Sequence, residues 1–213
     1  MSNKLIIDTS KKSSYIIVTY EDKMMSRILN EQTKVSENLL PTIDSLLAEF
    51  SISLQDLDCF CVVTGPGSFT GIRVGISTIK AFCQALGKKM VAKTSFEILN
   101  KNICDGVLCM KCTGTSMYYA KYDKFQLVDF GVVANDEIQN MSNNNEIYQI
   151  ENELCYDGDS CIIKNYIDIL NASFEEFVVN GEFVNFEQVE PFYIQASQAE
   201  IALIAKGNQD GKN

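Results

Sequence analysis

The first part of the chain has the pattern of hydrophobic and polar positions that β-strands show. Lys4–Ser10 and Ser14–Tyr20 are rich in β-branched and aromatic residues and are separated by a short polar turn, which indicates a hairpin. Met24–Leu29 has the same character, and Leu57–Val63 is an apolar run typical of a buried strand. We therefore expect a hairpin, a third strand and a later buried strand.

Two segments change to the helical period. In residues 36–50 the apolar side chains gather on one face, at Leu39, Leu40, Ile43, Leu46, Leu47 and Phe50. Because proline is tolerated only in a first turn, Pro41 places the start of this helix near Asn38. A second helix is expected over Phe69–Leu86, closed by Gly87. Its apolar and small residues cover about twice the roughly 100° face that packing on one sheet requires. This helix should be covered on a second side, by the chain's own first helix or by a partner.

Gly71 and Gly75 lie four residues apart within the second helix. A glycine inside a helix costs roughly 1 kcal/mol relative to alanine, which implies a compensating packing role. We expect the two glycines to clear space for the backbone of a neighbouring helix, so that this surface is an interface.

The order of elements starts again after Lys101. Three further strands are expected within residues 106–133, and Ile6–Tyr20 aligns with Leu108–Tyr122 at a constant offset. A repeated βββαβα order predicts an α/β duplication, the two-lobed actin-like ATPase (ASKHA) fold, with a trimmed second half. We place one lobe at residues 1–103, a smaller lobe at 104–205 and a disordered tail at 206–213. Ser160–Leu170 is expected to be a helix.

The stretch VTGPGSFTGIRVG, at Val63–Gly75, has the composition of a phosphate-binding loop. Its prolyl-glycyl pair fits a type II turn, Ser68 or Thr70 can cap the following helix, and free amides there can bind an anion. However, the spacing is one residue longer than the dinucleotide fingerprint and no Lys-Ser/Thr pair follows. A scaffold turn is therefore favoured. A vestigial phosphate or nucleotide site remains the alternative, with contacts at Asp8, Thr9, Ser10, Gly65, Gly67 and Ser68.

The composition narrows the chemistry. None of the 213 residues is histidine, which removes the commonest general base and metal ligand. Of the eight cysteines, Cys109 and Cys112 form a C-x-x-C on a predicted strand, where residues three apart face opposite sides; Cys59 and Cys61 are expected in the core. The net charge of −10 argues against direct, tight binding of nucleic acid. Without an apolar membrane span or signal-peptide pattern, we expect a cytoplasmic protein without a metal of its own.

Several segments match one known family in order and spacing. They are Ile6–Ser10, Ser36–Leu47, Val62–Gly87 and Thr94–Leu99, with a fainter match at Glu190–Gln195. Through them the chain resembles the TsaB (YeaZ) family, a subunit of the machinery that makes threonylcarbamoyladenosine in tRNA. The resemblance implies an actin-like ATPase fold without catalytic activity or an intrinsic cofactor. It also implies pairing with the homologous catalytic subunit TsaD through a helix bundle.

The resemblance also implies further partners. A small ATPase, TsaE, joins the complex, and ATP or ADP and a divalent metal are held by the partner subunits. Contact with tRNA is indirect, and the isolated chain can form a homodimer through the same surface. Carried onto this sequence, the interface comprises Leu39, Leu40, Ile43, Leu46, Leu47, Gly71, Val74, Gly75, Thr78 and Phe82.

The chain departs from the family pattern at three places. Asn38 stands where many relatives have histidine, Lys111-Cys112-Thr113 where an Asp-Ala-Arg run is common, and Gln195 where arginine often follows the late tyrosine. Two other functions stay open. One is an independent nucleotide-binding kinase or ATPase of the same fold. The other is a peptidase, for which Ser68 lacks any histidine partner.

Overall fold

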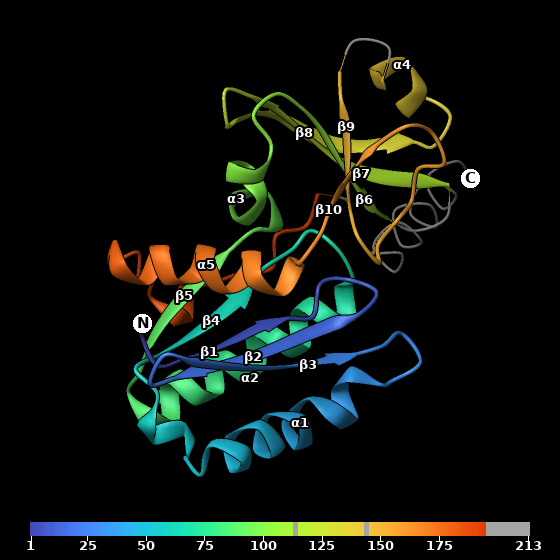
Figure 1. Cartoon of the computed structure of the whole chain (residues 1–213). Helices are drawn as coiled ribbons and strands as arrows, with labels where there is room; N and C mark the ends of the chain where they lie inside the picture. The colour runs from blue at the N-terminus through green and yellow to red at the C-terminus, as the bar shows by residue number, and fades with distance from the viewer. Residues whose placement is uncertain (113–114, 143–144, 195–213) are drawn as a thin grey trace, which may run out of the picture.

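Two five-stranded sheets form two lobes of the molecule (Figure 1). The computed structural model describes residues 1–112, 115–142 and 145–194. The first sheet has the order β3-β2-β1-β4-β5. Its strands are β1 (Lys4–Asp8), β2 (Ser14–Tyr20), β3 (Lys23–Leu29), β4 (Cys59–Val63) and β5 (Lys89–Lys93). β1 pairs antiparallel with β2 and parallel with β4, which confirms the predicted hairpin and buried strand.

The second sheet repeats this arrangement. Its order is β10-β9-β6-β7-β8, the same order of strand roles as in the first sheet when read from the other end. The strands are β6 (Gly106–Lys111), β7 (Ser116–Asp123), β8 (Gln126–Ala134), β9 (Ile147–Ile150) and β10 (Cys161–Ile163). The duplication inferred from the repeated pattern, and with it the two-lobed fold, is confirmed.

Helices cover both faces of the first sheet. α1 (Val35–Phe50) and α2 (Phe69–Leu86) lie on one face, below the sheet in Figure 1. α5 (Tyr166–Val179) packs against β1, β2 and β5 on the other face, near α3 (Ser95–Leu99), and separates the sheets in Figure 1. α4 (Ile138–Ser142) belongs to the second lobe, and short 3-10 turns lie at Leu54–Asp56, Asn100–Asn102 and Phe186–Gln188 (η3).

The facing sides of the two sheets share one hydrophobic core. Ile17 and Cys61 of the first sheet, Leu108 and Ala120 of the second and Phe174 of α5 all belong to it, and each is fully buried. A second core fills the space between the first sheet and α1 and α2. A third and smaller cluster covers the outer face of the second sheet. Because the central core includes both sheets, the lobes are packed together rather than tethered.

Two helix boundaries differ from those expected from the sequence. α1 begins at Val35, so Pro41 lies inside the helix rather than in its first turn. Pro41 is exposed, so the carbonyl that loses its amide donor lies on the solvent side. The helix expected over Ser160–Leu170 is wrong in its first half. Residues 161–163 pair with β9 as β10, and the helix starts only at Tyr166.

The cysteines lie where the strand pattern places them. Cys59 and Cys61 are buried on the same face of β4, and Cys109 is buried in the outer cluster of the second sheet. Cys112 packs against the central core on the opposite side. No group of three metal-binding side chains occurs in residues 1–112, 115–142 and 145–194. Within the same residues, no helix has the length and apolarity needed to cross a membrane.

Candidate partner-binding surface and inter-lobe junction

α1 divides the predicted interface residues between the core and the surface. Leu39, Ile43, Leu46 and Leu47 are buried against the first sheet because they recur at helical spacing on one side. Leu40 lies at the edge of this buried face, and 51% of it is exposed. Four of the five α1 residues predicted to meet a partner therefore pack within the chain itself.

α2 is covered on three sides by its own chain. Ile72, Ile76, Ile79 and Cys83 face the sheet, and α1 lies alongside. On the other flank runs the segment after η3, where Tyr193 stacks on Phe69 with ring centroids 4.1 Å apart. The Arg73 guanidinium donates to the Tyr193 hydroxyl at 2.7 Å. The apolar face of this helix is unusually wide largely because the helix is buried by its own chain.

Gly71 and Gly75 do not clear space for a partner. A Cβ on Gly71 would lie 2.0 Å from the Thr9 carbonyl oxygen, and one on Gly75 would lie 2.3 Å from the Thr9 hydroxyl. The Thr9 hydroxyl donates to the Gly71 carbonyl at 2.7 Å, which holds α2 against the end of β1. The prediction that these glycines open an intermolecular interface is wrong. They allow the helix to approach its own sheet.

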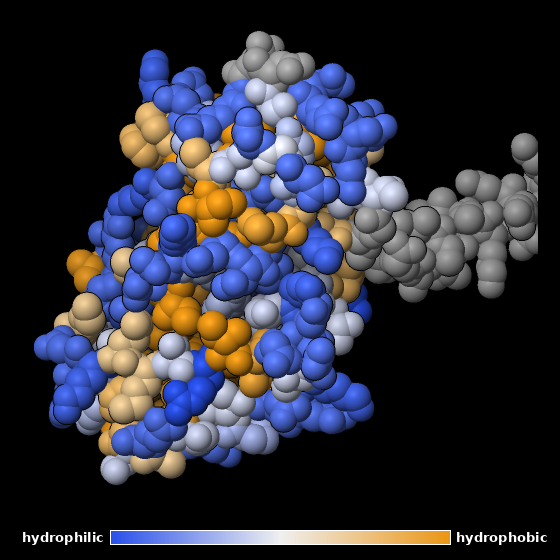
Figure 2. Space-filling view, turned by 45° about the vertical axis from the view of Figure 1, so that its right-hand side comes forward, coloured by the Kyte–Doolittle hydropathy of each residue, from blue (hydrophilic) through white to orange (hydrophobic). Residues whose placement is uncertain are grey.

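α1 and α2 contact each other, and their residues that remain at the surface make up an outer face of this lobe. Leu40 is exposed, while Val74, Thr78 and Phe82 are half-buried. The exposed positions around them carry mostly small or polar side chains, at Pro41, Asp44, Ser45, Ala48, Ser77, Ala81, Gln84 and Ala85. Figure 2 shows hydrophobic surface on the lower lobe and at the height where the lobes meet. A second helix pair could approach this outer face closely, because few long side chains project from it.

The glycine-rich loop before α2 binds its own chain. The Ser68 amide donates to the Ser10 carbonyl at 2.7 Å, and a Cβ on Gly67 would lie 1.9 Å from that oxygen. Ser68 caps α2 as predicted, since its hydroxyl accepts from the Gly71 amide. The turn is not type II, because Gly67 has a φ of 152° where that turn requires about +80°. The Ser68 amide of the loop is already satisfied by Ser10.

Asp8 is fully buried at the junction of the lobes, and other residues of the chain hydrogen-bond to its carboxylate. One oxygen accepts from the Ser10 amide and hydroxyl, and the other accepts from the Tyr166 hydroxyl at 2.8 Å. The Lys11 ammonium lies 3.7 Å from the same carboxylate and donates to Ser95. Burial beside Asp8 raises the pKa of Tyr166 well above its ordinary value, so this hydroxyl stays a donor.

These contacts do not fit a nucleotide or a metal ion. Thr9 is engaged by α2, Ser10 by the glycine-rich loop, and Asp8 by Tyr166 and Lys11. A phosphate or a magnesium ion would have to displace several buried hydrogen bonds at once. A pocket of about 500 Å³ lies elsewhere, in the second lobe, and is lined by Ser142, Asn145, Glu146, Tyr156, Asp159, Ser160 and Cys161. None of the predicted phosphate-contacting residues lines it.

The sequence pattern missed the residues that close this junction. Lys11 belongs to the short polar turn of the predicted hairpin, yet only 4% of its side chain is exposed. Glu153 is also buried, and it accepts a hydrogen bond from the Ser13 amide across the lobes. Tyr166 lies more than 150 residues from Asp8 in the chain. No local signal could have found these partners.

Comparison with known proteins gives consistent results. Residues 29–152 match the family model TsaD: tRNA N6-adenosine threonylcarbamoyltransferase. The chain is 33% identical over 99 residues to the tRNA threonylcarbamoyladenosine biosynthesis protein TsaB of Bacillus subtilis, covering 46% of this chain and 43% of that protein. It is 36% identical over 72 residues to TsaB of Haemophilus influenzae, covering 33% and 30% respectively. The chain thus spans less than half the length of these two relatives.

Solved structures extend the likeness over almost the whole fold. YeaZ from Pseudomonas aeruginosa superposes with a TM-score of 0.69 at 18% identity, covering 91% of this chain and 100% of that chain. A second Pseudomonas aeruginosa structure, described as similar to peptidase YeaZ, gives 0.72 at 18% identity, with 92% and 100% covered. At this identity the likeness supports the two-lobed fold. It carries no information about activity.

Proposed function

This chain belongs to the TsaD family and, within it, to the TsaB (YeaZ) proteins of tRNA threonylcarbamoyladenosine biosynthesis, and from that premise we propose that it is a non-catalytic subunit. Its role would be to bind and activate a TsaD-type catalytic subunit. The contact would be a helix bundle in which the outer face of α1 and α2 meets two helices of the partner. TsaE-type ATPase and tRNA would reach this chain only through that complex.

The observation that carries the proposal is the outer face of α1 and α2. It combines the exposed Leu40 with the half-buried Val74, Thr78 and Phe82, and small neighbours let another helix approach. Helix pairs pack at interaxial distances of about 8–10 Å, and small side chains at the contact favour the shorter distances. The interface is therefore a subset of the residues predicted from the sequence. The buried leucines and glycines support it from below without touching the partner.

The inter-lobe junction supports the absence of independent catalysis. Both oxygens of Asp8, the residue best placed to hold a cation, already accept hydrogen bonds from Ser10 and Tyr166, so a cation would compete with these donors. We therefore assign nucleotide and divalent metal to the partner subunits. Tight binding of ATP by the purified chain in calorimetry would instead support an independent kinase or ATPase.

The test is complex formation with matched variants. The purified chain should co-elute at micromolar concentration with the TsaD-type subunit of the same organism. Leu40→Lys should weaken binding at least tenfold, about 1.4 kcal/mol, because it places a charge in an apolar contact. Ile28→Lys on β3 is the control, since Ile28 is 50% exposed and Leu40 is 51% exposed. Failure of the unmodified chain to co-elute, or equal affinity of both variants, would contradict the proposal.

The same surface explains the homodimer expected of the isolated chain. Two copies meeting through α1 and α2 would cover each other's Leu40, and the TsaD-type subunit would compete for that contact. Addition of the catalytic subunit should then convert each homodimer into two heterodimers. A homodimer that persists at saturating partner concentration would have to use another surface.

A further inference from the structure

β8 forms an exposed edge of the second sheet. It is nine residues long and, in the described part of the chain, pairs only with β7. Along it Leu127 is 38% exposed, Val128 54% and Phe130 44%, and Phe125 in the preceding turn is 48% exposed. Asp129 is the one charged residue of the strand. Long, apolar strand edges are templates for pairing with another chain.

The other three sheet edges are protected in ways that β8 is not. β3 carries Lys23 and Arg27, and Arg27 pairs with Glu49 of α1. β5 is bridged by Val184, whose amide donates to the Met90 carbonyl at 2.9 Å. β10 is only three residues long. Charge, coverage and shortness are the usual means of preventing edge association. β8 is long, carries the single charge of Asp129 and one irregularity in its pairing with β7, and is not covered by any segment of the described residues.

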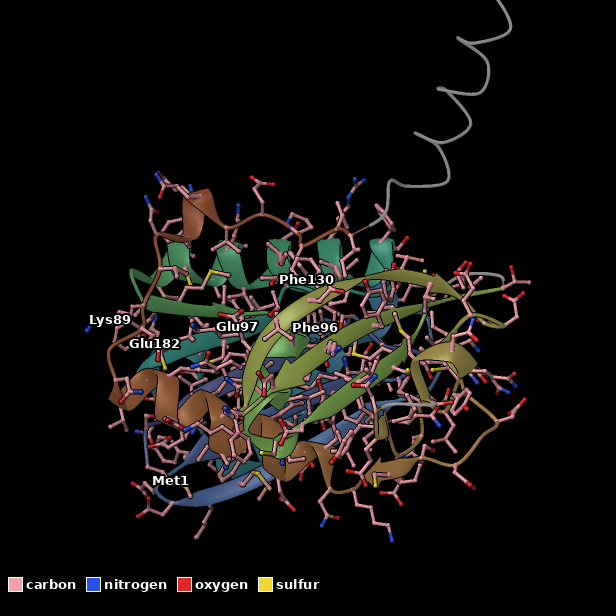
Figure 3. The ribbon with its side chains drawn as sticks, turned by 90° about the horizontal axis from the view of Figure 1, so that it is seen from above. Met1, Lys89, Phe96, Glu97, Phe130 and Glu182 are labelled. Carbon is pink, nitrogen blue, oxygen red and sulfur yellow. The ribbon has the colours of Figure 1, made fainter. Side chains whose placement is uncertain are left out.

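An aromatic cluster supports the inner face of this edge. Phe130 lies with its ring centroid 5.8 Å from that of Phe96 and 5.5 Å from that of Phe192. Figure 3 shows Phe96 and Phe130 close together where β8 passes over α3. Phe96 is buried in the central core, which fixes the exposed ring of Phe130 in position. An ordered apolar side chain can be buried by a partner at little cost in side-chain entropy.

We propose that two copies of this chain associate through β8, edge to edge and antiparallel, around a twofold axis at Gly131. The irregularity in the β7–β8 pairing lies opposite Lys121 and Tyr122, so Asp129–Val133 is the regular stretch available. In this register Phe130 faces Val132 of the other copy on the inner side, twice by symmetry. Asp129 faces Val133, so no like charges meet.

In the same arrangement Lys124 comes near acidic residues of the other copy. It is exposed in the β7–β8 turn, next to Asp123, and this turn lies beside the chain that follows β8 in the other copy. That segment carries Asp136 and Glu137, both exposed. Opposite charges at both ends of a twofold strand pair fix its register. A second copy is therefore the occupant that the strand's own pattern fits. This association uses a surface away from α1 and α2 and does not rest on the proposed function.

The experiment isolates this contact by disabling the helix surface first. In the Leu40→Lys background, sedimentation or light scattering at about 100 μM should give twice the chain mass of 23.8 kDa. Adding Phe130→Lys should return the single mass, with at least a tenfold weaker self-association, because it places a charge against Val132 of the other copy. Adding Ile28→Lys instead, at a site of similar exposure on β3, should leave the dimer intact. The charge reversal Lys124→Glu should weaken the dimer, and Asp136→Lys should partly restore it.

Each other outcome overturns the proposal. A Leu40→Lys chain that stays monomeric at this concentration would show that β8 does not pair. A dimer that survives Phe130→Lys would place the contact elsewhere. Hydrogen exchange gives an independent readout, since those amides of residues 129–133 that do not pair with β7 should become protected as concentration rises. Protection that is independent of concentration would mean that the chain's own residues, or nothing, cover this edge.

Discussion

The two lobes are built on the same strand order, yet they differ in what covers their sheets. The first sheet has α1 and α2 on its outer face and α5 on its inner face. The second sheet shares the central core, and among the described residues α4 and a loop cover its outer face. Residues 151–160 connect β9 to β10 where the first lobe has α2 between β4 and β5.

The loop that stands in place of this helix is held by a single buried side chain. Gln149 is 1% exposed, and its amide nitrogen donates to the Tyr156 carbonyl and to Ser160. Its oxygen accepts from the Cys155 and Tyr156 amides, so four hydrogen bonds hold the loop to β9. The comparison shows that a duplicated strand framework tolerates loss of a helix when the backbone groups of the replacing loop are satisfied. The extra helices of the first lobe provide the surface through which we propose that the partner binds.

The largest expected effect comes from breaking the close approach of α2 to its sheet. Gly75→Leu should lower the free energy of unfolding by more than about 3 kcal/mol, because its Cβ alone would collide with Thr9. Urea unfolding monitored by circular dichroism measures this change. Ala81→Leu, at an exposed position of the same helix, should stay within about 0.5 kcal/mol of the unmodified chain. Equal stability of the two variants would show that α2 can move away from β1.

An intermediate effect is expected at the loop of the second lobe. Gln149→Leu approximately keeps the size of the side chain but leaves the loop amides of Cys155 and Tyr156 without their acceptor. This should lower the free energy of unfolding by about 1–3 kcal/mol. Hydrogen exchange should accelerate in residues 151–160 and stay unchanged in β1 and β2. Gln84→Leu, at an exposed position of α2, is the control. If exchange in the loop were unaltered by Gln149→Leu, the side chain would not be what replaces the helix.

The smallest effect is a difference in pH dependence between two carboxylates. Burial opposes ionisation of Glu175, but hydrogen bonds from Lys4 and Ser2 outweigh it, and the pKa of Glu175 is lowered. Its contribution is present above the unfolded-state pKa, about 4.3, and is lost as pH falls through the folded value. Burial raises the pKa of Glu153, whose folded state therefore binds its proton more tightly. That contribution is present at low pH and is lost as pH rises through the folded value.

The two carboxamide variants should therefore diverge. Glu175→Gln should be least stable relative to the unmodified chain near pH 7, and the difference in stability between the two should shrink toward pH 3. Glu153→Gln should gain relative stability as pH rises from 4 to 7, because its amide oxygen can still accept from the Ser13 amide without a buried charge. Urea unfolding across this range gives both curves. The same trend in both variants would contradict the assigned shifts.

Local sequence signals predicted much of the fold, and their failures have identifiable causes. The bounds of α2 agree with prediction because Ser68 and Gly87 mark its ends and its period is regular. The start of α1 was misplaced because Pro41 is tolerated at an exposed helical position. Residues 161–163 fit a helical pattern, yet β9 offered a free edge to pair with. Pairing of that kind depends on a distant segment and leaves no local trace.

The sequence by itself determined the strand repeat, the two long helices, the capped start of α2 and the family, because each rests on periodicity or short motifs. Only the tertiary structure decided which residues remain available for chemistry or contact. It turned Gly71 and Gly75 toward Thr9, and it satisfied Asp8 with Tyr166 and Ser10. It also left Leu40 and β8 exposed. Burial depends on which segments far apart in the chain pack together, and the local pattern of a helix or strand shows which face is apolar but not what covers it.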